Sequence, residues 1–279
     1  MGETVNLSPS PGNGERRRRA WRPGAAIWLS AGFHISALFA LIARPQWWPS
    51  ILTALVLNHV VLALIGSWPR SRLLGANMLH LPEAAASRNE IALTFDDGPD
   101  PDVTPMVLDI LDSHQAKASF FVIGDKAAAH PELIREIVKR GHSIENHSQK
   151  HSNVFGFFPW TALRKDIGTA QETIAGITGR SPAFFRSPMG IRNPMLDPVI
   201  ARLGLRYITW TRRGFDTVAG DPAVVLERLT RNMSAGDILL LHDRRTRDQR
   251  AMVLEVLPAL LDRIAAAGLK PVSLPLAML

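Results

Sequence analysis

Two adjacent carboxylates, Asp96 and Asp97, follow an apolar run at residues 91–95 that has the length of a short β-strand. Gly98 and Pro99 come next and turn the chain away. Paired acids at the end of a strand can divide their roles, because one can bind a metal ion while the other accepts a proton. Asp-Asp-Gly-Pro is also a common surface turn, so the pair alone leaves a purely structural role open.

Two histidines, His147 and His151, form the second group. We expect them on a helical turn, where residues four apart face the same way and can share one cation. A pair of surface histidines is the alternative. An Asp from another strand end would complete a three-ligand set, which leaves a coordination position for water, as hydrolytic metals need. The chain has no cysteine, so any metal must be held by His, Asp or Glu.

Three further polar groups follow apolar runs, at residues 186–190, 210–216 and 239–243. Arg186 can keep a carboxylate ionised and fix its direction. The backbone N–H groups of the turn after it can face a developing oxyanion. A lone His after a strand usually has no chemical role. His242 becomes a candidate proton donor if an acid from a neighbouring strand keeps it protonated.

A scaffold that gathers strand ends is needed to bring these groups together. Apolar runs predict strands at 91–95, 118–123, 142–146, 183–186, 206–211, 238–241 and 272–274. Between them, helices are expected at 104–114, 131–140, 160–178, 194–203, 222–233 and 250–267. This alternation predicts an α/β fold with a parallel sheet, closed or nearly closed into a barrel. All five polar groups then lie at strand ends, where barrel enzymes carry their catalytic residues.

Taken together and in this order, the five groups resemble the polysaccharide deacetylase family (NodB-type, carbohydrate esterase family 4). The resemblance covers roughly residues 89–275 and includes the segments 120–124 and 141–146. It implies a distorted (β/α) barrel of about seven strands as the domain at 89–279. It also implies a hydrolase that removes N-acetyl groups from an amino sugar with the help of a divalent metal ion.

The resemblance assigns a metal-centred role to four residues. Asp96 matches the family's general base, and Asp97 matches a metal ligand. His147 and His151 match the other two ligands in the pattern His-(Ser/Thr)-x-x-His. Zn²⁺ is the first choice for a set of two imidazoles and a carboxylate, although other divalent metals fit.

Five more positions receive roles in the same way. Arg186 matches the residue that steers the base, and Met189 falls where a backbone N–H faces the oxyanion. Leu240 and His242 match the final Leu-x-His, with His242 as the general acid. Asp216 would orient His242 and keep it charged.

Three positions depart from the family pattern. Met189 replaces the usual Tyr, which is tolerable because the family uses the backbone of that residue. Arg213 replaces an Asp and Thr217 replaces a Trp, and these two changes alter the wall of the substrate groove. They put the family's polymeric chitin and peptidoglycan substrates in doubt for this chain, while the hydrolytic chemistry is unaffected.

Arginines are concentrated near the predicted strand ends. The set is Arg192, Arg212, Arg213, Arg244, Arg245, Arg247 and Arg250. Guanidinium groups suit phosphate, so these residues suggest a sugar on a phosphate- or diphosphate-linked lipid, or an anionic glycolipid. A basic loop that contacts anionic headgroups is an equally open alternative.

The N-terminal third predicts a membrane anchor. Residues 1–23 are polar and basic, which predicts a disordered tail. Uncharged runs at 24–43 and 50–68 approach the roughly 20 residues that cross a bilayer, and five of the seven tryptophans lie within 21–68. We therefore expect a transmembrane hairpin at 24–68 and a linker at 69–88. A cleaved signal followed by one span, or a buried soluble hairpin, are the alternatives.

The charge distribution supports the anchor and opposes a nucleic-acid partner. The chain has a net charge of +7, but residues 1–88 hold nine arginines against three acids, so most of the excess flanks the apolar runs. The positive-inside rule then places both ends and the catalytic domain on the cytoplasmic face of a bacterial-type inner (cytoplasmic) membrane. His34, Asn58 and His59 fall near mid-span, where a hydrogen bond between the helices is favoured over a functional role.

The expected partners are therefore a carbohydrate substrate, with a lipid-linked one as the sharper hypothesis, and the membrane. Two other functions stay open at this point. One is a deformylase or other deacylase of a lipid-linked amino sugar, because the sequence does not distinguish between acyl groups that differ by a methyl group. The other is a non-catalytic, carbohydrate-binding membrane protein. The presence of Asp96, Asp97, His147, His151 and His242 argues against the second.

Overall fold

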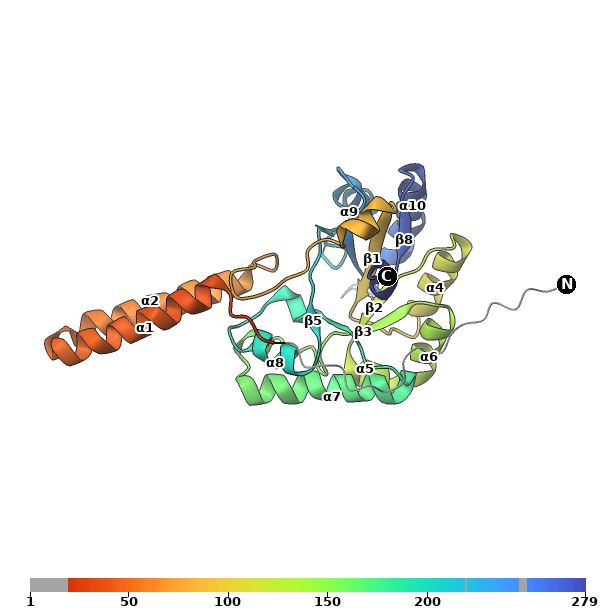
Figure 1. Ribbon diagram of the computed structural model, residues 1–279. Helices are drawn as coiled ribbons and strands as arrows, with labels where there is room; N and C mark the ends of the chain where they lie inside the picture. Colours follow the sequence, from red (N-terminus) through yellow and green to blue (C-terminus); the bar gives the residue numbers. More distant parts are fainter. Residues whose placement is uncertain (1–19, 219, 246–249) are drawn as a thin grey trace.

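A parallel β-sheet forms the centre of the computed structural model, which describes residues 20–218, 220–245 and 250–279 (Figure 1). Its strands are β1 (Glu90–Asp96), β2 (Ser119–Val122), β3 (Ser143–Asn146), β4 (Phe184–Phe185), β5 (Arg206–Tyr207), β6 (Arg212–Arg213), β7 (Ile238–His242) and β8 (Lys270–Val272). Seven of them run in the order β5-β4-β3-β2-β1-β7-β6, and β8 pairs with the start of β1. The predicted parallel (β/α) barrel is confirmed.

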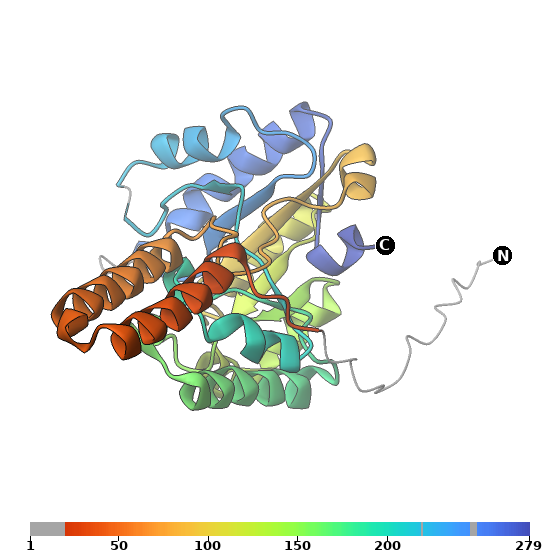
Figure 2. The same cartoon turned by 60° about the vertical axis from the view of Figure 1, so that its left-hand side comes forward.

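Helices surround this sheet and supply its apolar packing (Figure 2). They are α3 (Glu83–Ser87), α4 (Thr104–Ser113), α5 (Gly124–Ala129), α6 (Pro131–Lys139), α7 (Trp160–Thr178), α8 (Leu196–Arg202), α9 (Pro222–Thr230), α10 (Met252–Ala266) and α11 (Leu274–Ala277). Because strand side chains alternate, Leu93 and Phe95 of β1 pack in the helix-facing core, whereas Thr94 and Asp96 point to the opposite face. This alternation places Asp96 inside the barrel.

The expected strand at 206–211 is wrong as a single element. β5 and β6 lie at opposite edges of the sheet, and residues 208–211 cross the opening between them. The carbonyl of Thr209 accepts a hydrogen bond from the buried Arg186 guanidinium (2.9 Å), and the N–H groups of residues 208, 209 and 211 donate to three different segments, so no single partner strand continues along this stretch. An extended chain can continue as a strand only where its backbone groups find a partner strand.

The segment at 69–88, expected to be a linker, helps to fill this opening. Met78 forms a parallel bridge with Ile208, and Leu79 accepts a hydrogen bond from the Thr211 hydroxyl. Helix α3 also lies in this segment and contacts β1. The chain between the apolar hairpin and the first strand is thus part of the barrel.

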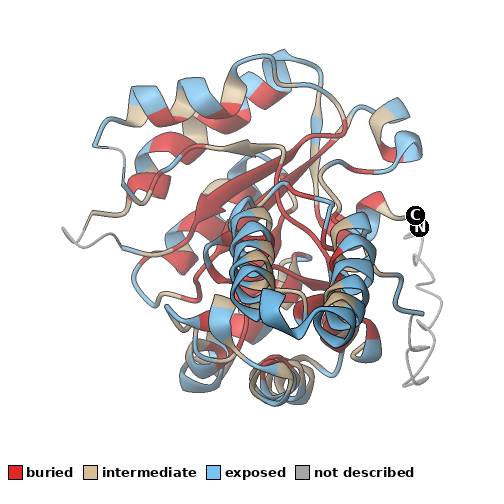
Figure 3. Cartoon of the chain, turned by 90° about the vertical axis from the view of Figure 1, so that its left-hand side faces the viewer, coloured by how far each residue is buried: buried red, intermediate tan, exposed pale blue. Residues whose placement is uncertain are grey.

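Two long apolar helices, α1 (Ala25–Ala43) and α2 (Trp48–Ser67), form a hairpin that projects from the barrel (Figures 1 and 2). The short helix η1 (Pro45–Trp47) connects them. Only 11% of each candidate span is buried, and Figure 3 shows their outer surfaces exposed. This exposure is unlike that of a core helix, so both are candidate membrane spans. Residues 1–19, most of the expected disordered tail, lie outside the described residues.

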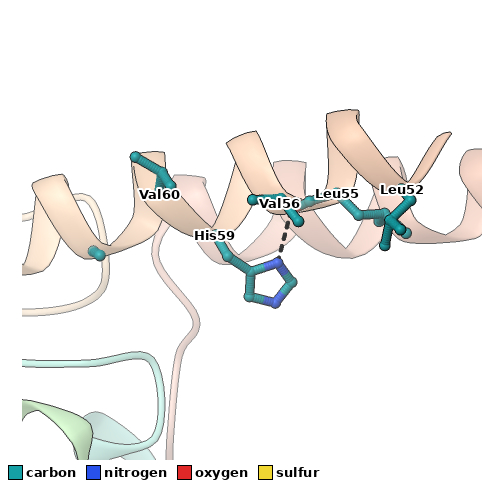
Figure 4. Close-up of a pocket in the computed structure, with 6 residues that line it drawn as sticks. Leu52, Leu55, Val56, His59 and Val60 are labelled. Carbon is teal, nitrogen blue, oxygen red and sulfur yellow. Dashed lines mark hydrogen bonds between the residues drawn. The ribbon is translucent and has the colours of Figure 1, made fainter. Parts of the chain in front are cut away.

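Polar side chains meet midway along the hairpin. Asn58 Nδ2 donates to Ser30 Oγ across the two helices (2.8 Å), and His34 Nδ1 donates to the Ser30 carbonyl (2.7 Å). His59 projects from α2 and bonds the Leu55 carbonyl of its own helix (Figure 4). The expected inter-helix hydrogen bond is present, and it joins Asn58 to Ser30 rather than to a histidine.

Candidate active site

Strand ends bring the predicted catalytic groups to one edge of the sheet. β1 ends at Asp96, which pairs in register with His242 at the end of β7. Asp97 follows with a φ of 74°, in the left-handed region, so its side chain departs from the strand alternation. Both neighbouring carboxylates consequently line the same pocket.

Asp97, His147 and His151 converge. Asp97 Oδ1 lies 3.3 Å from His147 Nε2 and 3.2 Å from His151 Nε2. One candidate ligand atom from each of the three residues lies within 4.8 Å of the others. Asp97 Oδ1 is buried and has no hydrogen-bond partner among the described residues, which a cation between the imidazoles would supply. The donor set and its spacing fit a divalent metal ion.

The two histidines do not lie on a helical turn as expected. The segment after β3 is irregular, with positive φ at Ser148 (70°) and His151 (50°). Ser148 N–H donates to Asn146 Oδ1 (2.9 Å), and His151 N–H donates to Ser148 Oγ (3.0 Å). Such side-chain bonds compete with helical hydrogen bonding. A side-chain-stabilised loop therefore brings the rings together, with centroids 5.1 Å apart.

Arg186 hydrogen-bonds both the candidate base and a candidate metal ligand. Its Nη1 donates to Asp96 Oδ1 (2.6 Å), and its carbonyl accepts a hydrogen bond from His147 Nδ1 (2.8 Å). The second bond fixes the tautomer of His147 and leaves Nε2 directed at Asp97. The Arg186 guanidinium is fully buried against the Phe121 ring. One residue thus orients both the candidate base and a candidate ligand.

His242 and Asp216 form a second buried pair. His242 Nδ1 donates to Asp216 Oδ1 (2.9 Å), and the other Asp216 oxygen accepts from the His242 backbone N–H (2.8 Å). Burial by itself lowers the pKa of His242, but the Asp216 charge and hydrogen bond outweigh it and raise that pKa above its ordinary value. The pair therefore favours a protonated imidazole at the pocket.

Asp97 is held ionised by the same balance. Burial would raise its pKa, but the nearby imidazole of His147, together with those of His242 and His151, lowers it far below the usual range. A carboxylate that stays ionised at all working pH values is suited to hold a cation.

The cavity at this edge of the sheet has a volume of about 150 Å³. It is lined by Asp96, Asp97, His147, His151, Met189, Gly190, Trp210, Arg213, Thr217, Leu240, His242 and Arg244. Ligand pockets that enclose whole drug-sized molecules are larger, so this cavity fits an acyl group with part of its carrier. Met189 has a φ of 57°, which turns the backbone at the rim of the cavity.

Of the six arginines near the strand ends that the structure describes, two line this cavity. Arg244 Nε donates to Asp97 Oδ2 (2.7 Å), and Arg213 stacks on Trp210 and Phe215. Arg245, a predicted substrate residue, instead pairs with Asp102 at the surface and does not line the cavity.

The remaining arginines also differ from expectation. Arg192 pairs with Asp197, Arg212 with Asp237, and Arg250 with Glu255, all through carboxylates outside the cavity. Arg247 lies outside the described residues. Sequence proximity to a strand end did not specify the direction of these long side chains.

Three residues of the site received no predicted role. Trp210 and Gly190 line the cavity, although both lie within the polar groups recognised in the sequence, whereas Thr217 lines it as the predicted groove wall requires. The third is Lys126. Lys126 Nζ donates to the Asp97 carbonyl (2.7 Å) and helps to hold the turn after β1. Lys126 lies in α5, a short helix without a clear apolar period, so the sequence carried no signal for it.

The comparisons with known proteins agree with this geometry. The family model described as polysaccharide deacetylase matches residues 83–208. The chain is 35% identical over 167 residues to a chitooligosaccharide deacetylase of Azorhizobium caulinodans, covering 60% of this chain and 79% of the relative. The chain belongs to the polysaccharide deacetylase family. It is accordingly a hydrolase of that family.

Two further relatives of this polysaccharide deacetylase show how far the similarity extends. A peptidoglycan-N-acetylglucosamine deacetylase of Bacillus cereus is 34% identical, over 55% of this chain and 72% of its own length. A family 4 carbohydrate esterase structure from Streptomyces lividans, in complex with acetate, has a TM-score of 0.60 at 29% identity, covering 66% of this chain and 91% of that chain.

A third comparison concerns the fold alone. A Bacillus anthracis protein described as a family pseudoenzyme has a TM-score of 0.65 at 22% identity and covers 73% of this chain and 69% of its own. Because a pseudoenzyme shares this fold, the fold by itself is insufficient evidence of catalysis. The side chains at the strand ends must carry that argument.

Proposed function

We propose that this chain is a metal-dependent N-deacetylase of an amino sugar. The observation that supports it best is the convergence of Asp97, His147 and His151, with Asp96 and His242 at the same cavity. Asp97, His147 and His151 would hold a divalent ion, with Zn²⁺ as the first choice. When bound, the ion would acidify a water molecule and polarise the acyl carbonyl.

The remaining roles follow from the contacts of each residue. Asp96 acts as general base, since its carboxylate lies at the cavity and a hydrogen bond from Arg186 fixes its direction. His242 acts as general acid and protonates the leaving amine, since Asp216 keeps the imidazole charged. The Met189 N–H stabilises the oxyanion at the rim. Leu240 forms part of the apolar wall around the acyl group.

We also propose that the substrate is membrane-associated, as a lipid-linked sugar or glycolipid. The candidate spans α1 and α2 support this, and so do Arg213 and Arg244 in the cavity lining. Guanidinium groups there suit a phosphate or another anion on the carrier. The hairpin would cross the inner membrane twice, and the arginine bias around it favours a cytoplasmic catalytic domain at 89–279.

The decisive experiment uses the purified full chain, loaded with Zn²⁺ and compared with chelator-treated protein. The substrates are N-acetylglucosamine linked to a polyprenyl diphosphate and a soluble chitooligosaccharide, followed by mass spectrometry. Loss of one acetyl group, dependent on metal and abolished by Asp96→Asn, is the expected result. Unchanged mass for both substrates, with metal bound, would favour the non-catalytic carbohydrate-binding alternative. Activity on N-formyl substrates alone would favour the deformylase.

A further inference from the structure

The loop between His151 and α7 carries an unusual surface. Residues 154–160 read Val-Phe-Gly-Phe-Phe-Pro-Trp and begin three residues after a candidate metal ligand. Phe157 is 85% exposed and Val154 is 55% exposed, although Phe155 beside them is buried. Phe155 anchors the loop in the apolar core together with Leu163 and Phe185. The loop is therefore held in place while two apolar side chains extend into the surroundings.

This loop lies beside the foot of the hairpin. Asn193 Nδ2 donates to the carbonyls of Gly156 (3.0 Å) and Phe158 (2.9 Å). The neighbouring Arg192 N–H donates to the carbonyl of Gly66 in the last turn of α2 (3.0 Å). Residues 191–193 therefore connect the exposed loop directly to the end of a candidate span. Figure 1 shows α8 and the start of α7 on the side of the barrel from which the hairpin projects.

The catalytic cavity opens at the same place. Gly190 lines the cavity, and a Cβ on it would lie 2.8 Å from the Pro69 side chain, just after α2. The catalytic rim thus packs against the base of the hairpin. Two further apolar side chains are exposed nearby. Trp68 (66%) directly follows α2, and Met195 (48%) lies two residues after Asn193.

The opposite end of the barrel exposes Leu276 and Leu279, close to the start of β2. The loops that lead into β2, β3, β4 and β7 also lie there, and among the described residues they expose no large apolar side chain. The loop at 154–160 therefore differs from the opposite end by its hydrogen-bonded connection to the end of α2, not by exposure alone. Trp and Phe favour the boundary between headgroups and acyl chains, which is the level expected for Trp68 at the end of a span.

We infer that Val154 and Phe157, together with Trp68 and Met195, form a membrane-docking surface that inserts into the headgroup–acyl boundary of the lipid bilayer. This inference rests on the proposed membrane anchoring of α1 and α2. Docking holds the cavity mouth against the bilayer, so the substrate class is an N-acylated sugar borne by a membrane lipid. A soluble sugar would reach the cavity without using this surface.

Insertion can be measured directly because the chain has no cysteine. Phe157→Cys carries an environment-sensitive fluorophore in the full chain, reconstituted into phosphatidylcholine–phosphatidylglycerol vesicles. Ala266→Cys, exposed at the end of α10 on the opposite side of the barrel, is the matched control. We expect spin-labelled lipid to quench the label at 157 and aqueous iodide to quench the label at 266. Equal iodide access at both positions would overturn the inference. Protection at 157 only after adding soluble oligosaccharide would also overturn it, as that would identify a sugar-stacking loop.

Activity gives an independent reading. Phe157→Ser is expected to lower kcat/KM about tenfold or more on vesicle-borne, polyprenyl-linked N-acetylglucosamine, through KM, because one large apolar contact with lipid is lost. Activity on a soluble chitooligosaccharide should stay unchanged, and the thermal midpoint should confirm folding. An equal loss on both substrates would contradict lipid docking. If no substrate is deacetylated at all, the proposed function fails while the quenching result still decides on insertion.

Discussion

The two ends of the barrel use left-handed backbone for different purposes. At the end where chains enter the strands, left-handed φ angles fall on residues that turn the chain toward the next strand, such as Gly141 before β3 (81°), Gly236 before β7 (85°) and Gln115 before β2 (51°). At the catalytic end they also fall on residues that line the cavity, namely Asp97, His151, Met189 and Gly190. A left-handed non-glycine residue costs about 1–3 kcal/mol, so this end accepts strain where a side chain or backbone group must face the cavity.

Burial of polar groups separates the helix-facing core from the catalytic end. The helix-facing core around Leu93, Phe95 and Phe120 is apolar. The catalytic end buries Arg186, Asp96 and His242 among mutual hydrogen bonds and ion pairs. Catalytic-end substitutions should therefore change activity more than folding, and entry-end substitutions should do the reverse.

The largest effect is expected at the candidate metal site. Asp97→Asn keeps the shape but removes the charge that faces both imidazoles, so metal should be lost. We expect kcat to fall about 10³-fold or more, because the metal supplies several kcal/mol of transition-state stabilisation. Elemental analysis and initial rates measure both effects. Asp102→Asn, at the surface, is the control. Retained metal at full occupancy would contradict the assigned ligand set.

A smaller loss of activity is expected at Asp216→Asn. Without the Asp216 charge, the raised pKa of His242 should fall, and the acid is needed in its protonated form. The alkaline limb of the pH–kcat/KM profile should then move to lower pH, with kcat reduced about 10²-fold. Asp262→Asn in the exposed part of α10 is the matched control. A profile that keeps its alkaline limb would argue against His242 as the general acid.

Next in size is an effect on stability at the entry end. His142 is buried behind β3, and its Nδ1 accepts a hydrogen bond from Ala118 N–H. Burial, together with Lys117, lowers the pKa of His142 to about 4. The unfolded chain therefore binds the extra proton first, and stability should decline as pH falls from about 6.5 toward 4. The full contribution is about 3 kcal/mol.

The test compares thermal midpoints of the wild type and His142→Gln between pH 7.5 and 5. Gln can still accept from Ala118 but does not titrate in this range, so the variant should lose less stability on acidification. Asp243, whose pKa burial raises to about 7, contributes the opposite trend in both proteins and cancels in the difference. Parallel pH profiles for the two proteins would refute the role of His142.

The smallest effects on stability and activity should come from substitutions at two residues with left-handed φ, one at each end of the barrel. Gly236→Ala forces a side chain into a left-handed position close to the Ala86 Cβ (3.3 Å) and should cost about 1–2 kcal/mol. Met189→Gly relieves the same conformation at the catalytic rim. It should retain most activity if only the Met189 N–H is used. Chemical denaturation and kcat measure the pair, and an inactive but folded Met189→Gly would show that the side chain is required.

The sequence by itself determined the parallel barrel, the apolar hairpin, and the strand ends that carry Asp96, Asp97, His147, His151 and His242. These follow from local signals, since apolar periodicity specifies elements and parallel strands end at a common edge. The family resemblance then matched the chain to the polysaccharide deacetylases, in agreement with the comparisons.

Only the tertiary structure decided the rest. It divided residues 206–211 between two sheet edges, replaced a helical turn at His147–His151 with a loop, and directed Arg245 toward Asp102 instead of the cavity. It also placed the exposed Phe157 loop beside the foot of the hairpin. Strand pairing, the direction of long side chains and the position of loops depend on contacts with residues distant in the chain. A local sequence pattern does not specify those contacts.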